Sequence, residues 1–219
     1  MSKYSHFRKS MNKYGENHSD SMRNRTKIVE RRRFLNSPTK SYITINDNPE
    51  KIPVIISEDD RMKEKRFLFL PDTHIETGWL IKDGQHHYLA VKRSDDDIYP
   101  QLFCELCNHE FIITTIKEKT IIGYNDLGYP EYDYVERHVT TPSVLYTNVY
   151  STLGNSVLSL PSGALKVRIP YKEEYLTLIK KNAQYTMNTG NYKITEISRD
   201  NAIYDREGYL EISLQREVD

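Results

Sequence analysis

The stretch Gly78–Lys92, GWLIKDGQHHYLAVK, decides the fold class. Two short runs that mix apolar, aromatic and polar residues lie on either side of an Asp83-Gly84 pair. An Asp-Gly pair between such runs is a strong signal of a β-hairpin, because the tight turn needs residues that tolerate a positive backbone φ. The stretch therefore predicts two antiparallel strands joined by a short turn.

The first of these strands contains the single tryptophan of the chain, Trp79, beside Leu80. Neighbouring residues in a strand point to opposite faces of the sheet, so one of the two side chains is expected in the core. We expect Trp79 to be the buried residue, because it carries the larger apolar surface.

Short strand patterns recur between turn signals on both sides of this hairpin. They favour a mainly β fold with two small β-barrel or sandwich-like modules and long protruding hairpins or loops, rather than βαβ units. We expect a basic N-terminal arm and helix over residues 1–39, a β-module over 40–118, and long hairpins or loops with a C-terminal β-module over 119–219. The expected strands are Ser41–Asn46, Ile52–Ser57, Arg66–Leu70, Gly78–Asp83, His87–Lys92, Ile98–Glu105, Phe111–Lys117, Ala164–Ile169, Gln184–Asn188, Tyr192–Ile197 and Tyr209–Gln215, with a short helical turn at Glu173–Ile179.

Charge is distributed unevenly, although the chain is neutral overall. Residues 1–40 contain eleven basic and three acidic residues, a formal charge of +8, and the remainder contains 20 basic and 28 acidic residues, a charge of −8. A helix is expected from Asp20 or Ser21 to about Leu35, ending before Pro38. So basic a helix favours docking on an acidic partner, on DNA or on another copy of the chain. The candidate partner-binding or DNA-binding residues are Arg23, Arg25, Lys27, Arg31, Arg32 and Arg33.

The middle segment, Lys119–Asn155, is rich in tyrosine and punctuated by glycine. Connections of this length without a function of their own are uncommon in compact domains. We interpret the segment as long hairpins or an extended loop that projects from the body, is mobile in the isolated subunit and becomes ordered on assembly. Tyrosine is enriched in protein interfaces. The candidate interface residues are Tyr124, Tyr129, Tyr132 and Tyr134.

Motifs for catalysis and metal binding are weak. The weak metal candidates are Cys104, Cys107 and His109, which fall short of the four ligands of a structural zinc site. The alternative is that one cysteine is buried as a small hydrophobe and the other lies near a turn. The acidic runs Glu58–Asp60 and Asp95–Asp97 are interpreted as solvated turns.

The signatures of common enzymes and of membrane insertion are also missing from the sequence. It contains no nucleophile elbow, zinc-protease motif, phosphate loop or dinucleotide fingerprint. We therefore expect no enzyme activity, no cofactor and no metal. The sequence also lacks an apolar run long enough to span a membrane and the pattern of a signal peptide, which predicts a cytoplasm-like compartment and no membrane partner.

A series of packing and turn motifs, each occurring once and in a particular order, spans most of the chain. The motifs are a basic helix ending in Phe34–Pro38, the strand Tyr42–Ile45, Gly78–Ile81, Tyr99-Pro100 running through Cys104 and Cys107-Asn108 into Phe111, and then Leu160–Gly163, Ala164–Val167, Tyr192–Ile197 and Gly208–Leu214. Taken together, they resemble the head-closure proteins, also called neck or head–tail connector proteins, of tailed phages that infect Gram-positive bacteria.

The resemblance implies a structural virion protein that forms a homo-oligomeric ring in the neck, between the portal protein or its adaptor and the tail or a tail-completion protein. Such a ring closes the DNA-filled head, lets the packaged DNA pass through its channel and offers a platform for the tail. It would assemble in the cytoplasm of the bacterial host. The family implies no catalytic residues. Reversing Arg31, Arg32 and Arg33 to glutamate is then expected to block attachment while the β-modules stay folded.

The residues themselves leave two other classes open. A nucleic-acid-binding protein with an OB-like barrel would place the basic arm on phosphates. A zinc or thiol enzyme would use the cysteine pair, Cys104 and Cys107.

Overall fold

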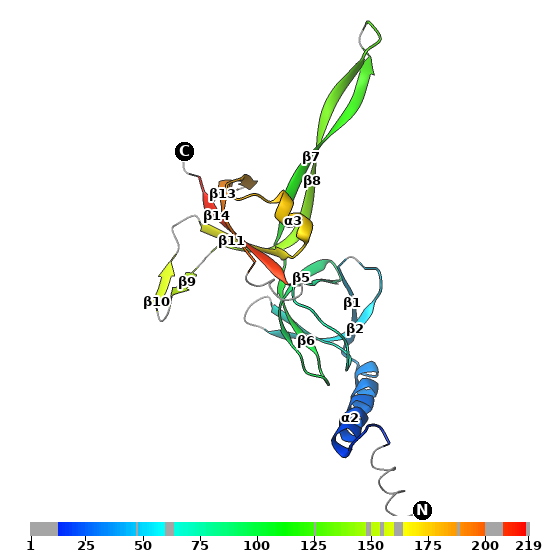
Figure 1. Cartoon of the computed structure of the whole chain (residues 1–219). Coiled ribbons are helices and arrows are strands. Elements are labelled where there is room, and N and C mark those ends of the chain that lie inside the picture. Colours follow the sequence, from blue (N-terminus) through cyan, green and yellow to red (C-terminus); the bar gives the residue numbers. More distant parts are fainter. Residues whose placement is uncertain are drawn as a thin grey trace, which may run out of the picture. The chain divides into compact units, whose positions relative to one another are not determined.

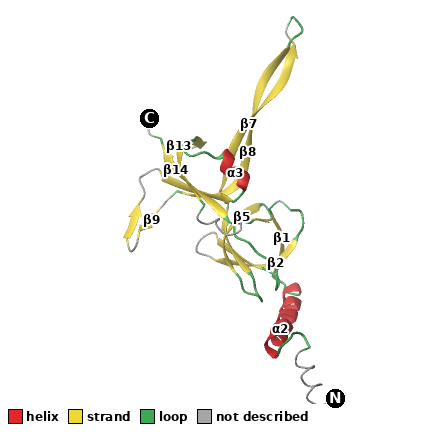
Figure 2. Ribbon diagram, viewed as in Figure 1, coloured by secondary structure: helices red, strands yellow, loops and turns green. Residues whose placement is uncertain are grey.

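The computed structural model describes residues 13–46, 48–59, 64–124, 126–147, 150–153, 156–159, 164–187, 189–199 and 208–217. Within these residues the chain is mainly β, with one long helix near the N-terminus, which confirms the predicted fold class (Figure 1, Figure 2). The chain divides into two compact units, Met1–Glu105 and Leu106–Asp219.

The long helix, α2, spans His18–Leu35. It begins slightly before the expected start because Asn17 caps it, with its side-chain oxygen accepting a hydrogen bond from the backbone N–H of Asp20 at 2.9 Å. Its end at Leu35 agrees with the prediction. Near that end Phe34 is buried, with an exposed fraction of 2%.

The first unit contains a closed six-stranded antiparallel barrel, in which every strand has a neighbour on both sides. The strand order is β1-β2-β3-β6-β5-β4, and pairing of β1 with β4 closes the barrel. The hairpin predicted around Asp83-Gly84 is present, with Gly84 and Gln85 as its two-residue loop and Gly84 at a φ of 61°. The strands are β1 (Lys40–Ile45), β2 (Ile52–Asp59), β3 (Glu64–Leu68), β4 (Leu80–Asp83), β5 (His86–Ser94) and β6 (Gln101–Leu106).

Leu80, not Trp79, is the buried residue of the pair at the start of β4. Trp79 is only half-buried, with its ring edge-on to Phe69 and its indole N–H donating to Glu76 at 3.0 Å. The expectation was wrong because an indole N–H needs a polar partner, and a half-buried position supplies one from a neighbouring carboxylate.

The second unit is built on a six-stranded sheet with the order β12-β13-β14-β11-β8-β7. A separate two-stranded hairpin is formed by β9 (Tyr150–Leu153) and β10 (Ser156–Ser159). The sheet strands are β7 (His109–Tyr124), β8 (Pro130–Tyr146), β11 (Ala164–Pro170), β12 (Gln184–Met187), β13 (Gly190–Ser198) and β14 (Tyr209–Arg216), and the predicted helical turn is present as α3 (Glu173–Leu178).

The two edges of this sheet, β7 and β12, approach each other through one aromatic side chain. Tyr185 on β12 stacks on Phe111 of β7, with ring centroids 4.6 Å apart. The Tyr185 hydroxyl accepts a hydrogen bond from the backbone N–H of Ile112 at 3.0 Å. The sheet therefore curls into a half-barrel whose core also includes Val167, Ile169, Leu210 and Ile212, together with Tyr175 of α3.

The division of the chain differs from the expected one in two places. The boundary lies between Glu105 and Leu106 rather than near residue 118, because β7 runs through that position as one strand of the hairpin. The N-terminal helix does not form a part of its own, since it belongs to the same compact unit as the barrel.

Leu80→Ala should lower the free energy of unfolding by about 2–5 kcal/mol, because it removes buried methyl groups and leaves a cavity in the barrel. Chemical denaturation of the full chain measures this loss. The control is Tyr42→Thr on β1, whose side chain is 55% exposed and whose replacement also favours a strand. The control should change stability by about 0.5 kcal/mol or less. Equal losses in the two variants would contradict the assignment of Leu80 to the core.

Candidate interaction surfaces

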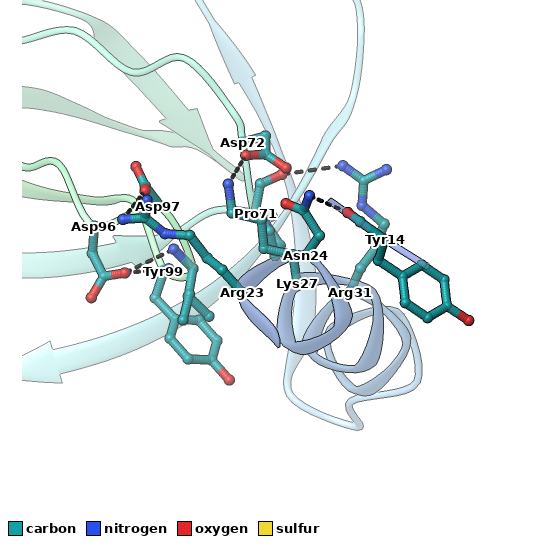
Figure 3. A network of polar contacts seen from close by, with 11 residues as sticks. Tyr14, Arg23, Asn24, Lys27, Arg31, Pro71, Asp72, Asp96, Asp97 and Tyr99 are labelled. Carbon is teal, nitrogen blue, oxygen red and sulfur yellow. Dashed lines mark hydrogen bonds and ion pairs between the residues drawn. The ribbon is translucent and has the colours of Figure 1, made fainter. Parts of the chain in front are cut away.

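The basic side chains of α2 divide into two groups, and the first group faces the barrel of the same unit (Figure 3). Lys27 forms an ion pair with Asp72 at 2.5 Å. Arg31 donates to the backbone carbonyl of Pro71 at 3.1 Å. These contacts hold the middle of the helix against the loop that follows β3.

A second set of polar contacts joins α2 to the loop before β6. Arg23 forms an ion pair with Asp97 at 2.5 Å. Tyr99 donates its hydroxyl to the carboxylate of Glu30, and this hydrogen bond, together with burial, raises the pKa of Tyr99 above its ordinary value. Asp96 accepts the backbone N–H of Tyr99 at 3.2 Å. Part of the acidic run 95–97, expected to be a solvated turn, thus helps to hold the helix.

The second group of basic residues lies on the other side of α2. Arg25 and Arg32 are exposed and seven residues apart, which places them on one helical face. Met22 and Val29 lie on the same face and are 52% and 41% exposed. We call Met22, Arg25, Val29 and Arg32 the outer stripe. Arg33 pairs with Glu30 of its own helix at 2.7 Å.

Of the six predicted binding residues, three therefore contact their own barrel, and one pairs within the helix. Sequence reasoning could not separate these groups, because their partners lie far along the chain. The triple reversal of Arg31, Arg32 and Arg33 would also break a contact that holds the helix. Variants of Arg25 and Arg32 test binding more cleanly.

The β7–β8 hairpin extends well beyond the sheet to which it belongs (Figure 1). Its strands are 16 and 17 residues long, and β11 pairs with β8 only along Val144–Tyr146. We call residues 114–124 and 126–139 the distal ribbon. The structure thus confirms that the first part of segment 119–155 projects as a hairpin, whereas residues 125, 148, 149, 154 and 155 lie outside the described residues.

The four predicted interface tyrosines all lie in the distal ribbon and are exposed. The register pairs Ile121 with Tyr132 and Lys119 with Tyr134, so these four residues share one face. The Lys119 ammonium lies 3.6 Å from the centre of the Tyr132 ring. This face combines a cation, two aromatic rings and an aliphatic side chain.

Sequence reasoning missed the aliphatic residues of the distal ribbon. Ile122 and Leu127 are 65% and 81% exposed, so Leu127 is more exposed than any of the four tyrosines and Ile122 is more exposed than Tyr132 and Tyr134. The available signal was the adjacent pair Ile121-Ile122 inside an otherwise polar, glycine-containing segment. Exposed apolar side chains gathered in one place mark an interaction surface.

The cysteines occupy two different environments. Cys104 is fully buried on β6, as the small-hydrophobe alternative expected, and Cys107 is half-buried. His109 lies 3.4 Å from the Tyr185 hydroxyl, and burial lowers the pKa of its ring. Among the residues that the structure describes, no three His, Cys, Asp or Glu side chains gather as a metal site, and no helix is long and apolar enough to cross a membrane.

A polar cluster on the second sheet is satisfied internally. Glu211 on β14 accepts hydrogen bonds from Lys166 and Arg168 on β11. Burial acts to raise the pKa of Glu211, but the two cations outweigh it and hold that pKa below its ordinary value. Arg168 also lies over the rings of Tyr146 and Tyr209. The cluster links three neighbouring strands, so we assign it to the stability of the sheet.

Comparison with known proteins bears on the second unit. Residues 108–215 match the sequence model of a family described as YomX C-terminal domain. The match begins at the start of β7 and ends in β14, so it coincides with the second compact unit. The family is phage-associated, of the Bacillus phage SPBeta-like type, and the match fits a phage protein. No curated protein and no solved structure matches the chain.

Two double substitutions remove equal charge from α2 but should differ in effect. Lys27→Ala with Arg31→Ala removes contacts to the barrel, and hydrogen bonds to charged groups contribute about 1.5–3 kcal/mol each when buried. Because Lys27 and Arg31 are partly exposed, the loss should be smaller, and we expect roughly tenfold faster amide exchange along α2.

Arg25→Ala with Arg32→Ala is the matched control, because both residues lie in the outer stripe. Its amide exchange along α2 should equal that of the unmodified chain. Mass-spectrometric hydrogen exchange compares all three proteins. Equal acceleration in both double variants would contradict the division of the basic residues into two groups.

Proposed function

We propose that the chain is a non-enzymatic structural protein of a tailed phage, which forms a ring in the neck between the portal and the tail. It closes the DNA-filled head and offers the platform for tail attachment. Its partners are other copies of itself, the portal protein or its adaptor, and a tail or tail-completion protein. The observation that carries the proposal is the distal ribbon, which extends from a folded sheet and exposes apolar side chains along its length.

The distal ribbon has the properties of an assembly element. A two-stranded ribbon is marginally stable alone in water, so a long one that exposes isoleucine, leucine and tyrosine gains stability when a partner covers it. Tyrosine suits such a surface, because its ring packs against the partner while its hydroxyl keeps a hydrogen bond. The phage-associated family matches the same unit, which supports a role in the phage particle.

The outer stripe supplies a second surface in this proposal. It combines two exposed arginines with two exposed apolar residues, Met22 and Val29. An acidic protein surface fits this mixture, since apolar contacts give affinity and the arginines give orientation. Duplex DNA fits it less well, because binding to phosphates relies on many cations rather than two.

A nucleic-acid-binding role is the second candidate function, and one observation on the barrel favours it. Phe103 on β6 is half-buried, and the cations of Arg66 and Lys92 lie 4.8 Å and 5.7 Å from the centre of its ring. An aromatic ring flanked by cations is the element that barrels use to stack a base beside a phosphate. Phe103→Ala would weaken binding to single-stranded DNA if this surface operates.

Deleting the gene from a phage that carries it should give DNA-filled heads without tails, and supplying the chain from a plasmid should restore infectious particles. A plasmid with Ile122→Ser and Leu127→Ser should fail to restore them, because it removes exposed apolar contacts without touching a core. Thr120→Ser, in the same ribbon, is the control and should restore normal titre. Electron microscopy and plaque counts measure the result. Normal tailed particles without the gene would contradict the proposal.

A further inference from the structure

Within the part of the chain that the structure describes, no further strand pairs with either edge of the distal ribbon. Among the described residues, β8 is the only strand that pairs with β7. The β11 strand pairs with β8 only along Val144–Tyr146, which lies outside the ribbon. Near the sheet, the outer edge of β7 is covered, because the N–H of Ile112 donates to Tyr185. No other strand of the described chain pairs with the outer edges beyond this point, so each strand of the ribbon presents a row of backbone donors and acceptors over about ten residues.

Folded proteins usually cover such edges or shorten them. The first unit follows this rule completely, since its barrel is closed. The second unit follows it at the base of the sheet through Tyr185. An open pair of edges combined with exposed apolar residues is therefore the surface in the described chain that most clearly lacks its partner.

The two strands of the ribbon differ in charge. Within the ribbon, β7 contributes Lys117, Glu118 and Lys119, a formal charge of +1. The β8 strand contributes Glu131, Asp133, Glu136 and Arg137, a formal charge of −2. Strands in a sheet lie about 4.8 Å apart and the Debye length is about 8 Å, so these charges act across a strand pair whichever face carries them.

We propose that the occupant is the distal ribbon of a second copy of this chain, with β7 of one copy paired to β8 of the next. Opposite charges meet in this arrangement, whereas pairing of two β7 edges or of two β8 edges brings like charges together. Ribbons that point the same way place β7 antiparallel to the neighbouring β8, which is the favourable sheet geometry.

This pairing joins two different edges, so it is a head-to-tail contact. Head-to-tail contacts continue from copy to copy and produce a closed ring or a filament, never an isolated pair. The inference deepens the proposed ring and rests on it for its biological meaning. The claim that copies of the chain associate through their ribbons can be tested on the purified chain alone.

Two charge variants test the pairing. Lys119→Glu gives β7 a charge of −1 against −2 on β8, and Glu131→Lys with Asp133→Lys gives β8 a charge of +2 against +1 on β7. Each variant alone sets like charges against each other at every contact. An equimolar mixture restores opposite charges at every contact, provided that the two variants alternate around the assembly.

Native mass spectrometry and light scattering of the full chain measure the concentration at which the oligomer forms. Each variant alone should need roughly tenfold more protein than the unmodified chain, since each like-charge contact costs a fraction of a kilocalorie and several act together. The mixture should return to near the unmodified value. Glu173→Lys with Glu174→Lys, on α3, is the matched control and should change nothing. Hydrogen exchange at low concentration verifies that the ribbon remains folded in each variant.

The inference would be overturned if the unmodified chain stayed monomeric at all concentrations. It would also be overturned if both variants formed oligomers at the same concentration as the unmodified chain, or if the mixture needed as much protein as each variant alone. These results are distinguishable from a failure of the proposed function. If the chain is found in the phage neck but its oligomers form independently of the ribbon charges, the proposed function is supported and the ribbon pairing is contradicted. If the chain pairs through the ribbon but is absent from phage particles, the ribbon pairing is supported and the proposed role in the neck is contradicted.

Discussion

The need to pair or cover strand edges organises the barrel of the first unit and the six-stranded sheet of the second. The barrel satisfies it by closure, with β1 paired to β4. The second sheet satisfies it near its base by curling until Tyr185 stacks on Phe111 and accepts the N–H of Ile112. The distal ribbon satisfies it on neither side within the described chain. Within the six-stranded sheet, the surface available for assembly is thus the part whose edges are not paired or covered by the described residues.

The N-terminal helix is held in place differently, since it has little apolar surface of its own. Phe34 is its one large buried apolar residue among those described, and polar contacts of Arg23, Lys27 and Arg31 also join the helix to the barrel. Exposed ion pairs contribute little each, so the position of α2 depends on several contacts acting together with Phe34. Using some cations for this purpose leaves Arg25 and Arg32, on the outer stripe, for a partner.

Local signals in the sequence were sufficient to predict the mainly β fold class, the hairpin at Gly84 and the residue at which α2 ends. Turn chemistry and the restriction imposed by Pro38 act over a few residues, so a single sequence reveals them. The closure by Tyr185 was not predictable in this way, because it joins residues 73 positions apart. The same reason applies to Lys27 and Asp72, which are 45 positions apart. The tyrosines of the ribbon were found by composition, whereas Ile122 and Leu127 were overlooked because a pair of isoleucines and a single leucine resemble ordinary strand sequence.

The central claim is that the distal ribbon becomes covered on assembly, and limited proteolysis of the full chain tests it most directly. Dilute protein and the assembled oligomer or neck are digested side by side, and the cleavage sites are read by mass spectrometry. The account predicts cleavage near Leu127 and Tyr129 in the dilute protein, where these side chains are exposed, and strong suppression in the assembly. Equal cleavage of the ribbon in both states would contradict it.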